Sequence, residues 1–530
     1  SLLSVYVAGP TALGAHANNI WVWSNAAGQA VLGGTVSGGQ LTKWSQGYLL
    51  LADPNNSYTG GSVVNGDAIT GSASLLGSLT RTGTPFGSGP ITVNPGAILR
   101  IADPSNISNN AVTILSDGAG LGGLGLAGNF APPAFLTSGT AASGQIVFRS
   151  TGDYGGVLAL DTFNYTQTLN MAALGGGRMW LGSSVISDSV GWSGNVNYFN
   201  PVLSPGSADT VATAPIFTGS TATTPVYRLG GGGNRAYLLL GAGAYENVLT
   251  GAANVQIGAL PVPNGAAGLS YINGNIGTVN LPNRNNLAPG SMVYVNRDSN
   301  LVIGNAFALG DATLVLNGGN MQINAPLLNP VSMLSDSVAF NNGSTPTSVL
   351  RGNVNLSPSG VGGTRTINTG GGIDTTIQGV VSGAVGTNLI KASGNGLMLS
   401  GMNTYLGTTT VSGGWLYLGS SALPNQAGAL GISDTPVLFS ANAGGLVLAG
   451  QVTLGRDVLV TQTGSLRNLS IYNAAVTGGV NLASGVTLTV ETASTGGAAI
   501  YQGGVLDLAG PVTGAGTLRI GLNNSGTVFL

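Results

Sequence analysis

The chain has very little charge and no cysteine. Among its 530 residues, 15 are Lys or Arg, 17 are Asp or Glu, and one is histidine, His16. So few cations cannot form an extended basic face, which excludes a general nucleic-acid-binding protein. The lack of cysteine excludes disulfide bonds and thiolate metal sites. Lys and Glu, which usually cover exposed helix faces, total four residues, so an ordinary helical protein is excluded as well.

Long hydrophobic runs and helix signals are missing too. Every apolar stretch approaching about 18 residues is interrupted by repeated glycines, so we expect no transmembrane helix in this chain. Apolar residues do not recur at helical spacing beside capping residues. The chain starts without Met and without a basic segment before an apolar core, which indicates a processed mature chain. A mean hydropathy of +0.32 with low charge is opposite to the composition of disordered chains.

Glycine, by contrast, is abundant, with 90 residues. It brackets short segments of alternating apolar residues such as Gly414–Gly419 (GWLYLG) and Gly516–Gly521 (GTLRIG). Alternation over four to six residues between turn residues is typical of half-buried strands. We therefore predict an all-β chain, with strands near 47–51, 96–101, 178–182, 314–323, 396–400, 415–418, 446–455, 486–490, 504–508 and 517–521.

A long internal repeat indicates how these strands are assembled. Lys43–Leu51 aligns without gaps on Lys391–Leu399, and Tyr58–Gly66 aligns on Tyr405–Gly413 after one residue is dropped. A single core stops growing near 250–300 residues, so a repeating chain of this length favours a solenoid of stacked coils. Both lysines of the chain occupy the same repeat position. We expect them to be structural, bonded to carbonyls or to an Asp on an adjacent coil.

The repeat resembles the autotransporter-associated β-strand repeat of large secreted bacterial proteins. The pattern is Leu-x-Lys, Gly-x-Leu-x-Leu and then Asn-x-Tyr-x-Gly-x-Thr-x-Val, with the best copy at 379–419 and a second at 33–66. The resemblance implies a right-handed parallel β-helix (β-solenoid). It also implies export by a Gram-negative-type bacterium, to an extracellular or cell-surface location.

Composition predicts three segments. Residues 1–118 form an N-terminal β-solenoid segment with one repeat copy, and residues 227–530 form a C-terminal β-solenoid that contains the clearest copy. Between them, 119–226 is less regular and loop-rich. Its stretches 119–150 and 197–226 carry Pro pairs and spaced prolines that a central ladder does not tolerate, so we expect loop excursions there.

Catalytic constellations are scarce. The single His16 is expected to be a loop or terminal residue, and Asp residues are spread singly, so the paired carboxylates of a glycosidase are not apparent. Arg456 and Asp457 are expected to be solvated charges. We predict no catalytic residue, no cofactor and no metal site. A polysaccharide-processing β-helix enzyme stays open as an alternative, because distant Asp residues can meet on stacked coils.

Exposed aromatic residues are the candidate contact sites. Alternation in 415–418 directs Leu416 and Leu418 inward and Trp415 and Tyr417 outward, and Trp180 is assigned to the same class. Trp and Tyr are favoured at the centres of interfaces. These three side chains are therefore candidates for contact with another subunit or a cell-surface glycan.

Two functions remain open at this point. The first is a non-enzymatic structural protein that self-associates into a fibre, sheath or surface layer. With so few charges, there is little electrostatic repulsion between copies of the chain, and head-to-tail contacts between copies would extend into a homopolymer. The alternative is a monomeric autotransporter-type adhesin passenger that binds a glycan or a host surface. The residues expected to mediate self-association are apolar and lie near the two ends: Leu2, Leu3, Val5, Tyr6, Val7, Val528, Phe529 and Leu530.

Overall fold

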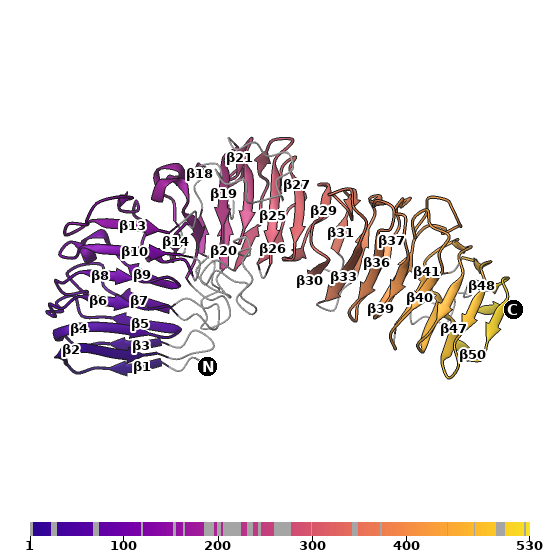
Figure 1. Cartoon of the computed structure of the whole chain (residues 1–530), viewed down its shortest axis with the longest axis horizontal. Helices are drawn as coiled ribbons and strands as arrows, with labels where there is room; N and C mark the ends of the chain where they lie inside the picture. The colour runs from indigo at the N-terminus through magenta and orange to yellow at the C-terminus, as the bar shows by residue number, and fades with distance from the viewer. Residues whose placement is uncertain are drawn as a thin grey trace. The chain divides into compact units, whose positions relative to one another are not determined.

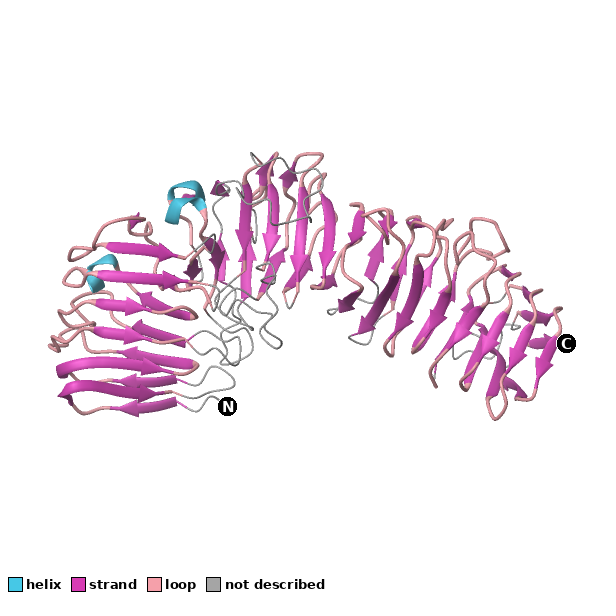
Figure 2. Cartoon of the chain, in the orientation of Figure 1, coloured by secondary structure: helices cyan, strands magenta, loops and turns pink. Residues whose placement is uncertain are grey.

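A computed structural model describes most of the chain, and it is built of β-strands joined by turns (Figure 2). Its only helices in the described part are three short 3-10 turns, η1 (Pro104–Ile107), η2 (Met171–Ala173) and η3 (Gly175–Gly177). The described residues are 4–22, 29–66, 74–117, 120–151, 155–162, 165–184, 196–198, 203–204, 224–230, 237–241, 245–258, 277–297, 299–341, 348–370, 374–442, 444–470, 472–493, 504–523 and 526–530.

The chain forms two compact units. Unit 1 is Ser1–Val302 with Ala308–Ala312, and unit 2 is Ile303–Phe307 with Thr313–Leu530. Within each unit, neighbouring strands of a sheet come from successive coils and pair in parallel, as at β5–β7 (Gly47–Leu51 with Ser74–Ser78) and β39–β41 (Gly414–Leu418 with Gly444–Leu448) (Figure 1). This confirms the predicted all-β parallel β-helix. Its right-handed sense and the three compositional segments stay predictions.

Unit 1 contains two long sheets and several shorter pairings. The first runs β1 (Ser4–Val7), β3 (Gln29–Leu32), β5, β7, β9 (Ala97–Ile101), β11 (Gly123–Leu126), β14 (Val157–Leu160), β16 (Trp180–Gly182), β19 (Val226–Leu229), β22 (Asn254–Ile257) and β25 (Met292–Asn296). The second runs β2 (Thr11–Trp21), β4 (Val36–Trp44), β6 (Ser62–Val64), β8 (Ile91–Val93), β10 (Val112–Ser116), β13 (Ile146–Ser150) and β12 (Phe135–Leu136). The other strands are β17 (Val196–Tyr198), β20 (Tyr237–Leu240) and β23 (Thr278–Leu281), β15 (Leu169–Asn170) with β18 (Leu203–Ser204), and β21 (Thr250–Gly251) with β24 (Asn286–Leu287).

Unit 2 contains four runs of strands, and β26 (Asn300–Ile303) spans the unit boundary in sequence. The first run is β27 (Thr313–Asn317), β29 (Val331–Met333), β32 (Val354–Asn355) and β35 (Val381–Ser382). The second is β28 (Asn320–Ile323), β30 (Ser337–Asn341), β33 (Thr364–Gly370), β36 (Asn388–Ala392), β38 (Thr409–Val411), β40 (Val437–Phe439), β43 (Val458–Val460), β46 (Val480–Leu482) and β49 (Val512–Gly514). The third is β31 (Ser348–Leu350), β34 (Thr375–Ile377), β37 (Gly396–Leu399), β39, β41, β44 (Gly464–Asn468), β47 (Thr487–Ala493) and β50 (Thr517–Asn523), and the fourth is β42 (Thr453–Leu454), β45 (Ala474–Val476), β48 (Val505–Leu508) and β51 (Thr527–Phe529).

Two predicted strands are in fact pairs of strands on different sheets. The segment 314–323 divides into β27 and β28, and 446–455 divides into β41 and β42. The first division occurs at Gly318, whose φ of 85° lies in the left-handed region that favours glycine. A glycine inside an apolar run therefore marks a corner of the coil here. The other eight predicted strands correspond to β5, β9, β16, β37, β39, β47, β48 and β50.

The expected excursion at 119–150 is narrower than predicted. Gly123–Leu126 pairs with both β9 and β14, so it continues the first sheet of unit 1. Its glycines are needed for packing: a Cβ added at Gly125 would lie 2.9 Å from Asp161 Oδ2. Among the described residues of 119–150, the chain leaves the long ladders at 120–122 and over 127–145, and both prolines of the stretch and the two-residue β12 lie in the second of these segments. Most of the second expected excursion, 197–226, lies outside the described residues.

The core is a column of leucines stacked coil upon coil. In the first sheet of unit 1, one inward position is leucine on six successive strands, and all six side chains are fully buried: Leu49, Leu76, Leu99, Leu124, Leu158 and Leu181. Burying a leucine stabilises the fold by about 1.5–3 kcal/mol. The solenoid thus extends its core by repeating one position.

The buried side chain of Asn56 ties its coil to the coils on both sides. The backbone N–H of Val36 donates to Asn56 Oδ1 at 2.6 Å, and Asn56 Nδ2 donates to the carbonyl of Pro85 at 2.7 Å. Asn56 belongs to the Asn-x-Tyr motif, and the Tyr58 hydroxyl lies 2.8 Å from Ser62 Oγ in the same coil. The motif recognised in the sequence is therefore a hydrogen-bonded bridge across three coils.

The second repeat copy builds the same bridge. Asn403 Oδ1 accepts from the N–H of Val381 at 2.7 Å, Asn403 Nδ2 donates to the carbonyl of Ala429 at 2.8 Å, and Tyr405 pairs with Thr409 at 2.8 Å. Val36 and Val381 are equivalent positions of the aligned repeat.

A third bridge was not recognised in the sequence. Asn285 accepts from the N–H of Leu249 at 2.9 Å and donates to the carbonyl of Ala308 at 2.8 Å. Leu287 stands at the position that tyrosine holds in the other two copies.

Candidate functional site

Trp415 and Tyr417 lie on the outer face of β39, as predicted. Leu416 and Leu418 are fully buried, whereas the two aromatic side chains are half-buried. The indole of Trp415 lies against Gly445 of the next coil, where an added Cβ would come within 2.6 Å of the ring. Glycine at 445 therefore makes room for a flat aromatic side chain on the sheet.

Trp415 already has a cationic partner within the chain. The guanidinium carbon of Arg467 lies 3.9 Å from the indole centroid, and Arg467 Nε lies 2.7 Å from Glu491 Oε2. A cation over the face of tryptophan is attracted by the ring quadrupole. This stacking occupies part of the indole surface that the sequence assigned to an external contact.

Tyr417 is coupled to an acidic side chain. Burial, followed by the charge of Asp374 and a hydrogen bond to it, raises the pKa of Tyr417 above its ordinary value, and Arg467 partly offsets this. Asp374 also accepts a hydrogen bond from the N–H of Gly396 at 2.6 Å. Each of the two outward aromatic side chains of β39 therefore already has a charged partner in the chain: Arg467 for Trp415 and Asp374 for Tyr417.

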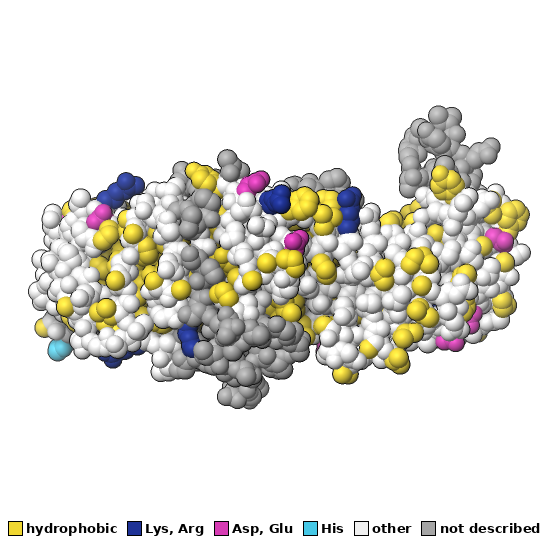
Figure 3. Space-filling view, turned by 90° about the horizontal axis from the view of Figure 1, so that it is seen from above, with side chains coloured by type: hydrophobic (Ala, Val, Ile, Leu, Met, Phe, Trp, Pro, Cys, Tyr) yellow, Lys and Arg dark blue, Asp and Glu magenta, His cyan; other side chains and the backbone are white. Residues whose placement is uncertain are grey.

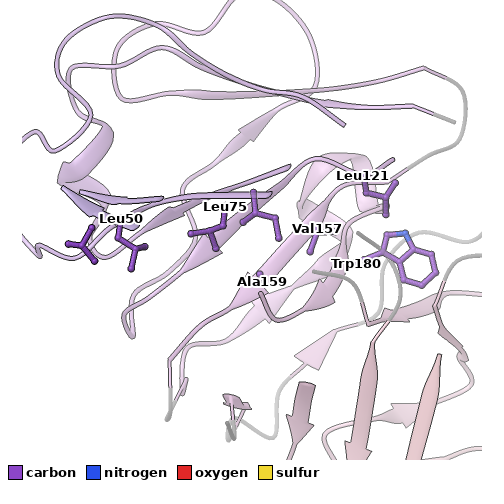
Figure 4. Packing of buried hydrophobic residues seen from close by; sticks show 8 residues of the cluster. Leu50, Leu75, Leu121, Val157, Ala159 and Trp180 are labelled. Atoms are coloured by element: carbon purple, nitrogen blue, oxygen red, sulfur yellow. The ribbon is translucent and has the colours of Figure 1, made fainter. Parts of the chain in front are cut away.

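Trp180 is not an exposed contact, which corrects the sequence-based assignment. Its side chain is only 6% exposed, pairs in register with Val157 of β14, and belongs to a buried apolar cluster that continues along the sheet to Leu75 of β7 (Figure 4). Strands of parallel sheets that are buried on both faces carry near-continuous apolar runs instead of alternation. Strands β7, β11, β14 and β16 of the first sheet of unit 1 are of this kind, because all their residues are buried, so an outward-pointing residue on these strands is not exposed.

Most of the side chains expected to mediate self-association that the structure describes are exposed. Val5, Tyr6 and Val7 on β1 are 59%, 64% and 40% exposed, and Phe529 on β51 is 55% exposed. Leu530 is exposed as well, Val528 is half-buried, and Leu2 and Leu3 lie outside the described residues. The two groups belong to different units, and contact between copies stays a prediction.

Both lysines have the structural role that was predicted for them. Lys43 and Lys391 are fully buried. Lys391 Nζ donates to the carbonyls of Ala392, Ser393 and Gly413 at 2.7, 2.9 and 2.9 Å. Lys43 Nζ donates to the carbonyls of the two residues that follow it and to Ser74 Oγ. Each ammonium group therefore closes the end of a strand and reaches the next coil.

This burial predicts that the folded chain resists amine-reactive reagents. The pKa of Lys391 is lowered to about 8 by burial, with Asp374 opposing the shift, so at pH 8.5 a large fraction of its amine is unprotonated and would react if accessible. We expect a succinimidyl ester to label neither lysine in the native chain and both after denaturation. Intact-mass and peptide mass spectrometry would measure this. Native labelling at Lys43 or Lys391 at the rate of a free peptide would contradict the described burial.

Arg456 is buried, which corrects its assignment as a solvated charge. It is 1% exposed and donates from Nη1 to the carbonyl of Leu430 at 2.6 Å and from Nε to that of Thr435 at 2.8 Å. Burial lowers its pKa below the ordinary value. Its neighbour Asp457 is exposed, as expected, and accepts from the N–H of Gly479 at 2.7 Å.

Charged side chains are few and scattered on the face shown in Figure 3. In the part of the chain that the structure describes, no three His, Asp or Glu side chains group so that they could hold a metal ion. His16 is exposed and lies in β2, beside a groove of about 690 Å³ that is also lined by Gly39, Gln40 and Thr59. Across the same described ranges, no helix has the length and hydropathy needed to cross a membrane.

The sequence did not single out the pairing of Trp21 with Trp44. These residues end β2 and β4, and their rings stack with centroids 5.4 Å apart and planes 12° apart. Trp21 is 64% exposed and Trp44 is half-buried. The signal that could have revealed the pair is the 23-residue spacing of the two tryptophans (44 − 21), since Leu41–Trp44 aligns by register on Asn18–Trp21.

Comparison with known proteins gives one partial similarity. No protein-family model matches the chain, and no solved structure matches it. The chain is similar to the adhesin BmaC autotransporter of Brucella suis biovar 1 (strain 1330), with 32% identity over 155 residues. The matched region is 27% of this chain and 4% of the relative, so the chain spans only a small part of that protein's length.

Proposed function

We propose that this chain is a non-enzymatic part of a surface-displayed bacterial passenger of the autotransporter type, with an adhesive role. The observation that carries the proposal is the similarity to an autotransporter adhesin in a chain that folds as a parallel β-helix. The repeat at 379–419, which resembles that of autotransporter passengers, supports the same location outside a Gram-negative cell. In this role the core sets the shape and the outer faces make the contacts.

The chemistry of the side chains supports a binding role over a catalytic one. The two lysines and Arg456 are tied to backbone carbonyls, and Asp161 is paired with Arg100 at 3.3 Å, so these buried charges brace the coils. The half-buried aromatic residues instead face outward. A polysaccharide-processing enzyme remains the weaker alternative, and turnover of a glycan by the purified chain would favour it.

Self-association into a fibre, sheath or surface layer is the second candidate. Exposed apolar side chains on β1 and β51, such as Tyr6 and Phe529, support it. Low net charge would oppose such packing little, since the chain carries a formal charge of −2 at pH 7.

One experiment separates these candidates. Residues 1–530 are coupled to beads, and attachment to host epithelial cells is counted against beads carrying the heat-unfolded chain. We expect the folded chain to raise attachment severalfold and to remain monomeric by light scattering. Background attachment together with filaments in electron micrographs would reject adhesion and favour the structural role. Background attachment by a monomer would reject both.

A further inference from the structure

The second sheet of unit 1 carries an outward column of aromatic and amide side chains near Trp21. Trp21 pairs with Trp44, and Asn65 and Asn94 follow on the next two coils, directly after β6 and β8, because the N–H of Asn65 bonds to the Lys43 carbonyl and that of Asn94 to the Val64 carbonyl. Adjacent strands lie about 4.8 Å apart. Four coils thus place two indoles and two amides in one line along the solenoid.

This column is held in place by its own hydrogen bonds. Trp44 Nε1 donates to Asn19 Oδ1 at 3.0 Å, and Asn94 Nδ2 donates to Asn65 Oδ1 at 2.6 Å. The Asn65 amide nitrogen and Asn94 Oδ1 are left to bond an external group. A donor next to an acceptor matches hydroxyl groups, each of which can donate and accept.

The column carries no charge. None of its four residues is ionisable, and the neighbouring outward positions are Thr42, Val63 and Thr92. An anionic ligand would find no cation along this line. The chemistry therefore suits a neutral ligand with an apolar face and several hydroxyl groups.

The same two strands border the groove beside His16. Its lining from Gly38–Gln40, Thr59 and Gly60 is rich in glycine and neutral polar groups, and with a volume of about 690 Å³ it is a groove open to solvent, which suits an extended ligand. Ala17 of this lining is four residues from Trp21, about 13 Å along an extended strand. An oligosaccharide of a few rings is long enough to contact both features.

We infer that the β2–β4 surface of unit 1 binds a neutral oligosaccharide, with a sugar ring stacked on Trp21 and hydroxyl groups bonded to the adjacent polar side chains. The inference rests on the proposed adhesive function and assigns it a ligand class. A sugar fits better than a protein partner here, because the exposed indole is flanked by amides, hydroxyls and glycines, whereas protein interfaces have apolar, desolvated centres.

The test is binding of the intact chain to immobilised oligosaccharides. The probes are neutral hexasaccharides of glucose, mannose and N-acetylglucosamine, with oligogalacturonate and heparin fragments as anionic probes. We expect at least one neutral probe to bind, and Trp21→Ala to weaken that binding about tenfold or more through loss of ring stacking. Gln40→Ala, at the groove, should weaken it as well. Tyr472→Ala is the control, because Tyr472 is also an exposed aromatic residue, at 51%, but lies in unit 2 between β44 and β45.

Several outcomes would overturn the inference. Binding of anionic probes alone, no binding of neutral probes, or equal loss in Trp21→Ala and Tyr472→Ala would each do so. If the chain bound no sugar but bound a protein, and Trp21→Ala weakened that binding, the surface would be assigned to a protein partner. Cell attachment that Trp21→Ala leaves unchanged would reject this site while the adhesive function stands. Sugar binding at Trp21 without any cell attachment would reject adhesion and retain the site.

Discussion

Replacing Arg456 with methionine is expected to lower the free energy of unfolding by about 2–5 kcal/mol, since it leaves the buried Leu430 carbonyl and the partly buried Thr435 carbonyl without donors. The guanidinium bonds to Leu430 and Thr435 of the preceding coil, with a further bond from Nη2 to Thr435 Oγ1 at 2.9 Å. Methionine replaces most of the volume but has no N–H group. Unfolding in urea, followed by circular dichroism, would measure the loss.

Arg519→Met is the matched control for this prediction. Arg519 lies on β50 of the same unit and is exposed, so the same substitution should change the free energy by less than about 0.5 kcal/mol. Equal effects of the two substitutions would show that Arg456 does not brace the coils. A loss of unfolding free energy in Arg456→Met but not in Arg519→Met would show that the buried guanidinium of Arg456 holds neighbouring coils together.

Replacing any of the three bridging asparagines with alanine is expected to cost about 2–4 kcal/mol, because each removal orphans one buried N–H and one buried carbonyl. At Asn56 the orphaned groups are the Val36 N–H and the Pro85 carbonyl. Asn403 and Asn285 likewise each accept from one backbone N–H and donate to one backbone carbonyl of the neighbouring coils. Thermal and urea unfolding of the single variants would measure the effect.

The neighbouring Asn55 provides an internal control. It precedes Asn56 directly but is exposed, so Asn55→Ala should change stability by less than about 0.5 kcal/mol. Tyr58→Phe should fall between the two, because it removes only the hydroxyl contact with Ser62. If Asn285→Ala were as mild as Asn55→Ala, the bridge at 249–308 would not be equivalent to the other two.

Local patterns were sufficient where a residue's role depends on its own coil and its repeat. The alternation in Gly414–Leu418 correctly separated buried leucines from outward aromatic residues, and the matched positions of Lys43 and Lys391 correctly predicted structural lysines bonded to carbonyls. Periodicity specifies which side of a strand a residue faces. It does not specify what covers that side, which is why Trp180 was placed on the surface.

The sequence by itself determined the all-β class, the repeating coil and the absence of thiol chemistry. Strand alternation and glycine corners can be recognised from neighbouring residues, and the lack of cysteine follows from composition. Only the tertiary structure decided that Arg456 is buried, that Asn285 completes a third bridge, and that Trp21 stacks on Trp44. Each of these depends on residues that are 20 to 40 positions apart in the chain and meet because coils stack in parallel about 4.8 Å apart. That register follows from the lengths of all the intervening loops, and no local pattern encodes it.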